Sequence, residues 1–191
     1  MAHVPSVATT ELELLTFRQA LEAANTPSPD YDIEKWLYAP NFYSEYRYLL
    51  GTRGKNPLIC IGINPSTARP DALDNTLKSV ERIALGNGFD SFLMFNVYAQ
   101  RATSPDDMEK VYNPALHKEN LEAFRYILSI SDKPSVWAAW APSSKSAPTC
   151  RIASGIWCTP EKNSVPAGTA PEPSPKKDIP ITPCTCARTK S

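Results

Sequence analysis

The sequence lacks any apolar run long enough to cross a membrane. A transmembrane helix needs roughly 18 consecutive apolar residues, and the 191 residues contain no such stretch. The opening residues, MAHVPSVATTELELL, also lack the basic flank and apolar segment of a signal peptide. We therefore expect no membrane partner and a cytoplasmic location.

No excess of either charge is present, since 20 Lys and Arg balance 20 Asp and Glu. This balance, with 42% hydrophobic residues, excludes a collagen or a coiled coil and indicates an ordinary globular protein. Histidine is scarce, with only His3 and His117. The five cysteines lack the spacing of a zinc site, so we expect neither a metal nor a cofactor.

Glycine is also sparse, with 7 residues against 19 prolines, and the prolines are unevenly placed. Residues 141–191 hold nine of them, four of the five cysteines, and a net charge of +4, which leaves −4 on the first 140 residues. We interpret the chain as an N-terminal helix and linker (1–30), an α/β domain (31–140) and an irregular tail rich in Pro and Cys (141–191).

Apolar periodicity within the first 140 residues predicts alternating helices and strands. Helices are expected over 10–24, with a capping box at Thr10 to Glu13, and from Asp74 to about Gly86. A third is expected after Asn113, with Leu121, Phe124 and Leu128 on its apolar face.

Short apolar or aromatic runs predict strands over 43–50, 58–63, 91–97 and 135–140, with a turn over 51–54. Strands that alternate with helices favour a three-layer α/β/α fold around a mostly parallel sheet.

In such sheets, ligands bind in the crevice beyond the carboxyl ends of the strands. Two predicted strands end in an asparagine, Asn64 and Asn96, and a side-chain amide offers a ligand both a donor and an acceptor. Asparagine also starts turns for backbone reasons alone, so both interpretations remain open at this stage.

Longer strings carry a family resemblance. YSEYRYLLGTRGKNPLICIGINPSTARPDALDNTLKSVERIA, FDSFLMFNVYAQRATSPDDM, HKENLEAF and VWAAW resemble the bacterial and phage family DUF1643, over about Asp32 to Trp140. More distantly, the family is similar to the uracil-DNA glycosylase superfamily. Gly62-Ile63-Asn64-Pro65 matches that superfamily's first active-site motif, and FLMFN resembles its later strand, which ends in a base-reading asparagine.

The resemblance implies a uracil-DNA-glycosylase-like fold and hydrolysis of an N-glycosidic bond in DNA. Asn64 would then position the attacking water, and Asn96 would make paired hydrogen bonds to the flipped base. Around them we expect a substrate-binding set in which Ser66 and Thr67 bind phosphate or sugar, Tyr98 stacks on a base or packs at the rim, and Gln100 and Arg101 contact phosphate or lie in a solvated loop. The remaining members of the set are Gly62, Ile63 and Pro65.

The superfamily also has a later His-Pro loop, which this sequence lacks. Read with the codons shifted by one base, residues 176–190 permit KGHPHHPLYLRKD followed by a stop, which resembles the missing loop. Our hypothesis is that residues 141–191 are translated out of frame after Trp140, which would truncate the domain and inactivate it. The competing interpretation is a natural Pro-rich disordered tail.

Two other functions remain open. The charge of −4 on the first 140 residues is unfavourable for gripping DNA, which favours a non-catalytic module that binds a free nucleobase or nucleotide. A local basic patch would offset this charge, and its candidates are Arg47, Arg53, Lys55, Arg69 and Arg101. The second is a protein-interaction role through an aromatic anchor formed by Trp36, Tyr38, Phe42 and Tyr43. The sequence does not predict an oligomeric state.

Overall fold

A computed structural model describes residues 2–139 and the backbone of residues 184–185. The chain forms one six-stranded sheet in the order β1-β2-β4-β3-β5-β6. The strands are β1 (Trp36–Ala39), β2 (Leu49–Thr52), β3 (Pro57–Gly62), β4 (Ser91–Asn96), β5 (Ser135–Ala138) and β6 (Cys184–Thr185).

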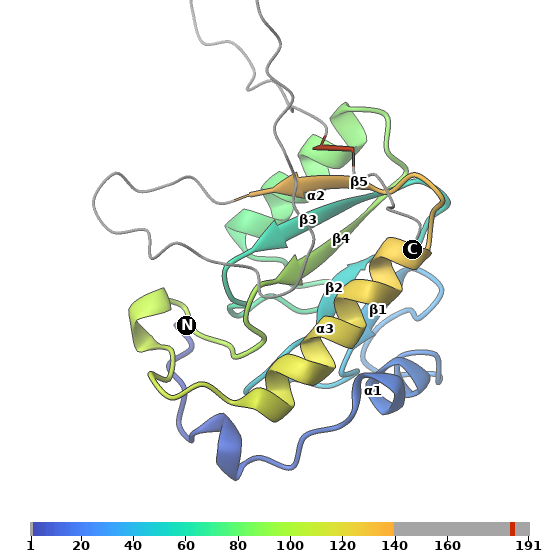
Figure 1. Cartoon of the computed structure of the whole chain (residues 1–191). Helices are drawn as coiled ribbons and strands as arrows, with labels where there is room; N and C mark the ends of the chain where they lie inside the picture. Colours follow the sequence, from blue (N-terminus) through green and yellow to red (C-terminus); the bar gives the residue numbers. More distant parts are fainter. Residues whose placement is uncertain (1, 140–183, 186–191) are drawn as a thin grey trace, which may run out of the picture.

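Helices cover both faces of this sheet (Figure 1). Helix α2 (Asn75–Gly86) packs on one face, and α1 (Phe17–Ala23) and α3 (Pro114–Ser129) pack on the other. Two short 3-10 turns, η1 (Thr9–Glu11) and η2 (Pro105–Asp107), complete the regular structure of the described residues. The predicted α/β fold with three layers is confirmed. None of the helices described is both long and apolar enough to span a membrane.

The sheet is mixed, and the prediction of a mostly parallel sheet was wrong. Only β4, β3 and β5 run parallel, whereas the β1–β2, β2–β4 and β5–β6 pairs are antiparallel. Parallel neighbours need a crossover of a dozen or more residues, and α2 and α3 provide one for β4 and β5. The shorter connection from β1 to β2 favours an antiparallel pair.

The N-terminal helix is shorter than the predicted 10–24. Helix α1 begins after Thr16, whose side chain forms a capping box with Gln19, and the Thr10 box is not used. The reason lies in the buried tyrosines of the sheet. The Tyr46 hydroxyl accepts a hydrogen bond from the Leu15 N–H (2.9 Å), and the Tyr48 hydroxyl donates to the Leu15 carbonyl (2.7 Å). These bonds hold the backbone before Thr16 outside the helix.

Strand β2 runs through part of the predicted turn at 51–54. Gly51 lies opposite Leu93 of β4, and a Cβ at Gly51 would stand only 2.0 Å from the Phe92 carbonyl oxygen. Glycine is therefore needed here for close approach of two strands rather than for a turn.

The later elements agree better with prediction. Asp74 caps α2, whose buried face is Leu77, Val80 and Ala84, and Asn113 caps α3 with Pro114 at its first position. The predicted apolar face of α3 lies at the edge of its buried face, because Leu121, Phe124 and Leu128 are half-buried and only Phe124 and Leu128 pack against the core cluster. The face that points at the sheet carries Leu116, Asn120, Ala123 and Ile127.

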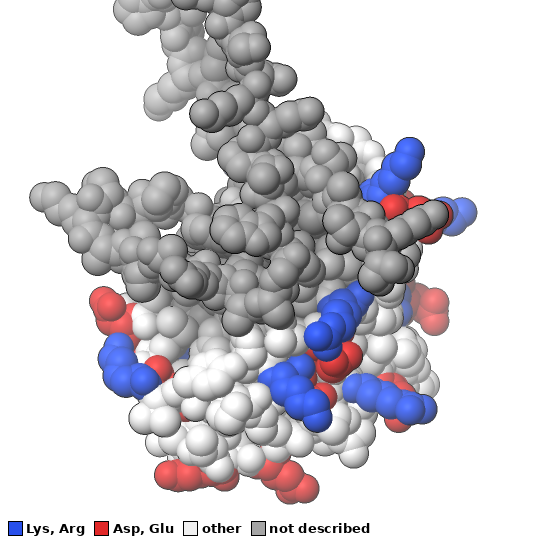
Figure 2. All heavy atoms as spheres, viewed as in Figure 1, with Lys and Arg blue, Asp and Glu red and all other residues white. Residues whose placement is uncertain are grey.

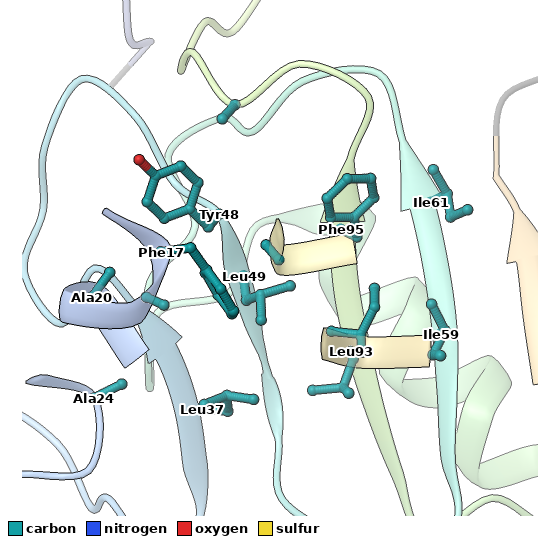
Figure 3. Close-up of a cluster of buried hydrophobic side chains, with 14 of the residues drawn as sticks. Phe17, Ala20, Ala24, Leu37, Tyr48, Leu49, Ile59, Ile61, Leu93 and Phe95 are labelled. Carbon is teal, nitrogen blue, oxygen red and sulfur yellow. The ribbon is translucent and has the colours of Figure 1, made fainter. Parts of the chain in front are cut away.

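Two apolar clusters hold the layers together. Between the sheet and the α1/α3 layer, Phe17 packs edge-on to Tyr48, with ring centroids 6.0 Å apart, and Leu93 and Phe95 point from β4 into the same cluster (Figure 3). Alternate residues of the central strands point the other way, toward α2, and include Leu58, Cys60, Phe92 and Met94. Both faces of β3 and β4 are thus buried.

The predicted irregular tail lies outside the described residues, apart from Cys184 and Thr185. These two residues form β6, which pairs with Val136 and Ser135 of β5. The division of the chain at residues 30 and 140 stays a prediction.

Candidate functional site at the ends of β3 and β4

The segments that follow β3 and β4 run side by side. The Val97 N–H donates to the Gly62 carbonyl (2.9 Å), the Tyr98 N–H to the Ile63 carbonyl (3.0 Å), and the Ala102 N–H to the Pro65 carbonyl (2.8 Å). The structure therefore brings together the two segments that carry the predicted site residues. This arrangement follows from β3 and β4 being parallel neighbours.

Asn64 is half-buried, and its side-chain orientation is fixed by the chain itself. Its Nδ2 donates to the carbonyl oxygens of Ala102 (2.7 Å) and Pro65 (3.1 Å). Both donor positions of the amide are thus used, which leaves the Oδ1 atom as the group able to bind a ligand or water. The same bonds tie the β3 end to the β4 end.

Asn96 lies next to Gly62 across the β3–β4 pair and is only 1% exposed. A Cβ on Gly62 would stand 2.8 Å from Asn96 Nδ2, so glycine is required for the amide to fit. Asn96 Oδ1 accepts from Arg47 Nη2 at 3.3 Å, while Nδ2 has no hydrogen-bond partner among the described residues. Because arginine only donates, it fixes the amide with oxygen toward Arg47.

The main chain at the end of β4 is held from the opposite face. Asn120 of α3 donates from Nδ2 to the carbonyl oxygens of Asn96 (2.9 Å) and Val97 (3.2 Å). Sequence analysis missed this residue because a polar side chain inside a helix gave no sign of a contact 24 residues away.

Arg47 and Arg101 are both buried behind the 66–68 segment. Arg47 Nη1 donates to the Ala68 carbonyl (3.0 Å), and Arg101 Nη1 donates to the carbonyls of Ala68 (3.1 Å) and Ser66. Arg101 Nη2 donates to the Tyr38 hydroxyl (2.9 Å). The two guanidinium groups thereby fasten this segment to the sheet.

Burial affects both cations, and repulsion by Arg101 adds to its effect on Arg47. Desolvation, with the positive charge of Arg101 as the next cause, lowers the pKa of Arg47 to about 9. Burial likewise lowers the pKa of Arg101. Neither forms a salt bridge with an acidic side chain of residues 2–139. The hypothesis of a basic surface patch therefore fails for these two arginines, and on the face shown in Figure 2 positive and negative side chains are interspersed.

The remaining predicted binding residues have structural contacts. The Tyr98 hydroxyl donates to Glu109 Oε1 and accepts from the Asn113 N–H (3.2 Å), and burial raises its pKa to about 12. Gln100 is buried, and its Oε1 accepts from the Glu109 N–H (2.8 Å). Ser66 and Thr67 are half-buried, and Ser66 Oγ lies 3.4 Å from Thr103 Oγ1. The ligand contacts expected of these residues stay predictions.

One family model matches more than half of the chain. It is described as "Protein of unknown function (DUF1643)", and it matches residues 47–154. The chain belongs to the DUF1643 family. No curated protein and no solved structure gives a significant match. The DUF1643 match begins at Arg47 and includes both asparagines and both buried arginines.

A cleft is lined partly by residues within 30–43, which precede the segment matched by the DUF1643 model, and partly by residues 69–72 of that segment. It has a volume of about 450 Å³, and its lining includes Tyr31, Tyr38, Phe42, Tyr43 and Arg69. Arg101 connects this cleft to the strand ends, because it lies beneath Tyr43, 4.3 Å from the ring centroid, and binds Tyr38. The predicted aromatic anchor is only partly exposed, since Trp36 and Tyr38 are buried.

The doubly wound part of the DUF1643 sheet has its topological switch between β3 and β5. The connection through α2 leads from β3 to β4 on one side of β3. The connection through α3 then leads from β4 to β5 on the other side of β3. Ligands of such sheets bind at this switch, beyond the carboxyl ends. The segment with Asn64 forms one side of it, and the residues after β5 lie outside the described part. Within the described residues, no three His, Cys, Asp or Glu side chains form a group able to hold a metal ion.

Proposed function

We propose that this site recognises a nucleobase, and that the complete DUF1643 domain hydrolyses an N-glycosidic bond in the manner of the uracil-DNA glycosylase superfamily. The observation that carries the proposal is the orientation of Asn64. Its Nδ2 is committed to Ala102 and Pro65, so Oδ1 is left to accept a hydrogen bond. A fixed acceptor at a strand end is what is needed to orient an attacking water.

The topology supports the same proposal. Asn64 follows β3, the central parallel strand, and stands at the switch point where doubly wound sheets bind ligands. Asn96 ends the neighbouring parallel strand, in the order and place that the superfamily resemblance requires. We also propose that the fold is distantly similar to that of the uracil-DNA glycosylases.

Asn96 supplies a donor suited to a base carbonyl. Its Oδ1 is bound to Arg47, and its buried Nδ2 has no partner among the described residues. An unpaired buried donor costs about 1–3 kcal/mol, which a carbonyl on a bound base would recover. Because Asn96 is only 1% exposed, a base can reach Nδ2 only if a neighbouring group moves.

We also propose that residues 141–191 are out of frame, and that the chain as it stands is inactive. The shifted reading restores a His-Pro-rich string, and the residues that would follow β5 at the switch point belong to the shifted part of the chain. The family match runs on to residue 154 and does not itself support a shift at Trp140. DNA sequencing across codon 140 tests this proposal directly. One missing nucleotide is expected, and an intact frame in independent reads would refute it.

The activity test uses three proteins: the chain as given, its frame-restored version, and Asn64→Ala in the restored version. Base release is measured on DNA duplexes that carry uracil or other altered bases. We expect release by the restored protein only, with a loss of at least about 100-fold in Asn64→Ala. Asn87→Ala is the matched control, because Asn87 Nδ2 also donates to a backbone carbonyl, that of Ile83 (2.8 Å), but at the end of α2. Equal activity of Asn64→Ala and Asn87→Ala would refute the role of Asn64.

A second candidate is a binding module without catalysis. It is favoured by the burial of Arg47 and Arg101, which removes two cations from the surface that would contact a DNA backbone. Calorimetric titration of the restored protein with free nucleobases, nucleotides and DNA separates the two candidates. Binding of the small ligands with no base release from any duplex would favour this module.

A further inference from the structure

Three side chains from two distant parts of the sequence form a chain of hydrogen bonds at the edge of the cleft. His3 Nε2 lies 3.0 Å from Glu45 Oε2, and the Tyr43 hydroxyl lies 3.0 Å from His3 Nδ1. The cluster is partly shielded, since the side chains of His3 and Glu45 are 12% and 20% exposed. Its order is carboxylate, imidazole, phenol.

The Glu45 carboxylate fixes the direction of these bonds. An ionised carboxylate only accepts, so the proton of a neutral imidazole must be on Nε2. Nδ1 is then an acceptor, and the Tyr43 O–H donates to it. The second Glu45 oxygen accepts from Ser6 Oγ (2.9 Å), which holds the carboxylate in place. A nucleophile or base, a histidine beside it, and a third group that orients the histidine make up the catalytic triad arrangement.

The cluster is tied to the candidate site by the backbone. The His3 N–H donates to Thr103 Oγ1 (2.6 Å), and the Thr103 N–H donates back to the His3 carbonyl (2.8 Å). The Arg101 N–H donates to the Glu45 carbonyl (2.8 Å). Both partners flank Ala102, whose carbonyl oxygen accepts from Asn64. Figure 1 shows the N-terminus beside the segment that follows β4.

Tyr43 also lines the cleft, where its side chain can meet a ligand. The residue is 45% exposed, and the Arg101 guanidinium lies under its ring. The exposed Phe42 and the free side of Tyr43 are suited to stack on a planar ligand.

We propose that Glu45, His3 and Tyr43 form a proton relay in which the Tyr43 oxygen is the general base for a water beside a planar ligand in the cleft. The water proton passes to Tyr43 Oη as the phenol proton passes to His3 Nδ1, and the imidazolium is stabilised by Glu45. The hydroxide equivalent forms a C–O bond to the sugar carbon as the N-glycosidic bond breaks, the base leaves with the electron pair of that bond, and the proton now on the imidazolium passes through solvent to the departed base. The identity of the reaction rests on the proposed function, whereas the relay itself can be tested without a substrate.

The first test measures the reactivity of Tyr43 in the full chain with an arylsulfonyl fluoride. In this reaction an O–S bond forms at the phenol, fluoride leaves, and His3 takes the phenol proton. Tyr112 is the internal control, because it is more exposed (58%) and faces His117 at 5.3 Å between ring centroids without a hydrogen bond between the two side chains. Peptide mass spectrometry gives the two labelling rates in the same sample.

We expect Tyr43 to be labelled roughly tenfold faster than Tyr112, a modest share of the roughly 100-fold or more that a positioned base contributes. His3→Gln and Glu45→Gln should bring the ratio close to one, and His117→Gln should leave it unchanged. Equal labelling in the parent chain, or a ratio unaffected by His3→Gln, would overturn the relay.

Nitrogen NMR of the two histidine rings gives an independent measurement. We expect the neutral form of the His3 ring to carry its proton on Nε2, and Tyr43→Phe to change the His3 Nδ1 signal while Tyr112→Phe leaves the His117 signals unchanged. A neutral ring with its proton on Nδ1 would exclude the proposed direction of transfer.

In the base-release assay, Tyr43→Phe should reduce activity of the restored protein. Base release by a protein in which Tyr43 is labelled no faster than Tyr112 would refute the relay alone. Fast labelling of Tyr43 without base release would refute the proposed function alone.

Discussion

The two faces of the sheet differ most at the carboxyl ends of β3 and β4. On the α1/α3 face, the apolar cluster extends to Ile61 and Phe95, each one residue before the end of its strand. On the α2 face, the next residues are Gly62 and Asn96, and behind them lie Arg47 and Arg101. The same pair of strands therefore ends in hydrocarbon on one side and in buried polar groups on the other.

This difference separates the residues that stabilise β3 and β4 from the residues that we assign to the candidate site. The apolar face gains free energy from burial alone, at about 25 cal/mol per Å². The polar face needs a specific partner for every buried donor and acceptor, and several lack one: Asn96 Nδ2, Arg47 Nε and Arg101 Nε have no partner among the described residues. Such groups are costly to bury, which is why we place the ligand site on this face.

Phe95→Ala gives the largest expected effect on stability. Phe95 is 6% exposed and packs on Phe124 with ring centroids 5.0 Å apart, so its removal leaves a cavity. We expect the free energy of unfolding to fall by about 3–5 kcal/mol in urea denaturation. Phe42→Ala, at a residue 49% exposed, should cost less than about 0.5 kcal/mol. Similar losses at both positions would mean that the apolar face does not hold the fold.

Gly62→Ala tests the polar face with an intermediate effect. The new Cβ would stand 2.5 Å from Met94 Cε and 2.8 Å from Asn96 Nδ2. We expect a loss of about 1–3 kcal/mol, because one of these side chains must move. At Gly86 the space is open, so Gly86→Ala in α2 should be neutral or stabilising. A neutral Gly62→Ala would show that the contact with Asn96 is loose.

The smallest expected effect is one of pH on Cys60, which lies on the α2 face of β3. Burial raises the pKa of its thiol to about 12 from an ordinary value near 9. The neutral thiol therefore contributes stability that is complete below pH 9 and is lost as the pH rises from 9 to 12. Between pH 8.5 and 10, the parent chain should lose about 1 kcal/mol more than Cys60→Ala. An equal loss in both proteins would mean that the thiol is solvated.

The fold was predictable where local signals agree. Helix α2 carries its own cap at Asp74 and its own apolar face, and the runs that became β3 and β4 are unmistakable. The N-terminal helix was misplaced because Thr10 and Thr16 both have capping-box spacing, and the choice between them depends on Tyr46 and Tyr48. Strand β1 was not predicted, since its burial depends on pairing with β2.

For the site, the sequence placed Asn64 and Asn96 together because parallel strand ends meet at one edge. It did not predict what fixes their amides. The Arg47 contact to Asn96 spans 49 residues, and the Tyr43 contact to His3 spans 40. Such contacts depend on the sheet order, which no local pattern encodes.

The hydrogen bonds between the segments after β3 and β4 have a kinetic consequence. The segment after β4 supplies the donors and the segment after β3 the acceptors: Ile63 and Pro65 accept from Tyr98 and Ala102. Movement of either segment breaks these bonds, so the amide protons of Tyr98 and Ala102 should exchange together. A ligand that orders either segment would then slow exchange at both positions.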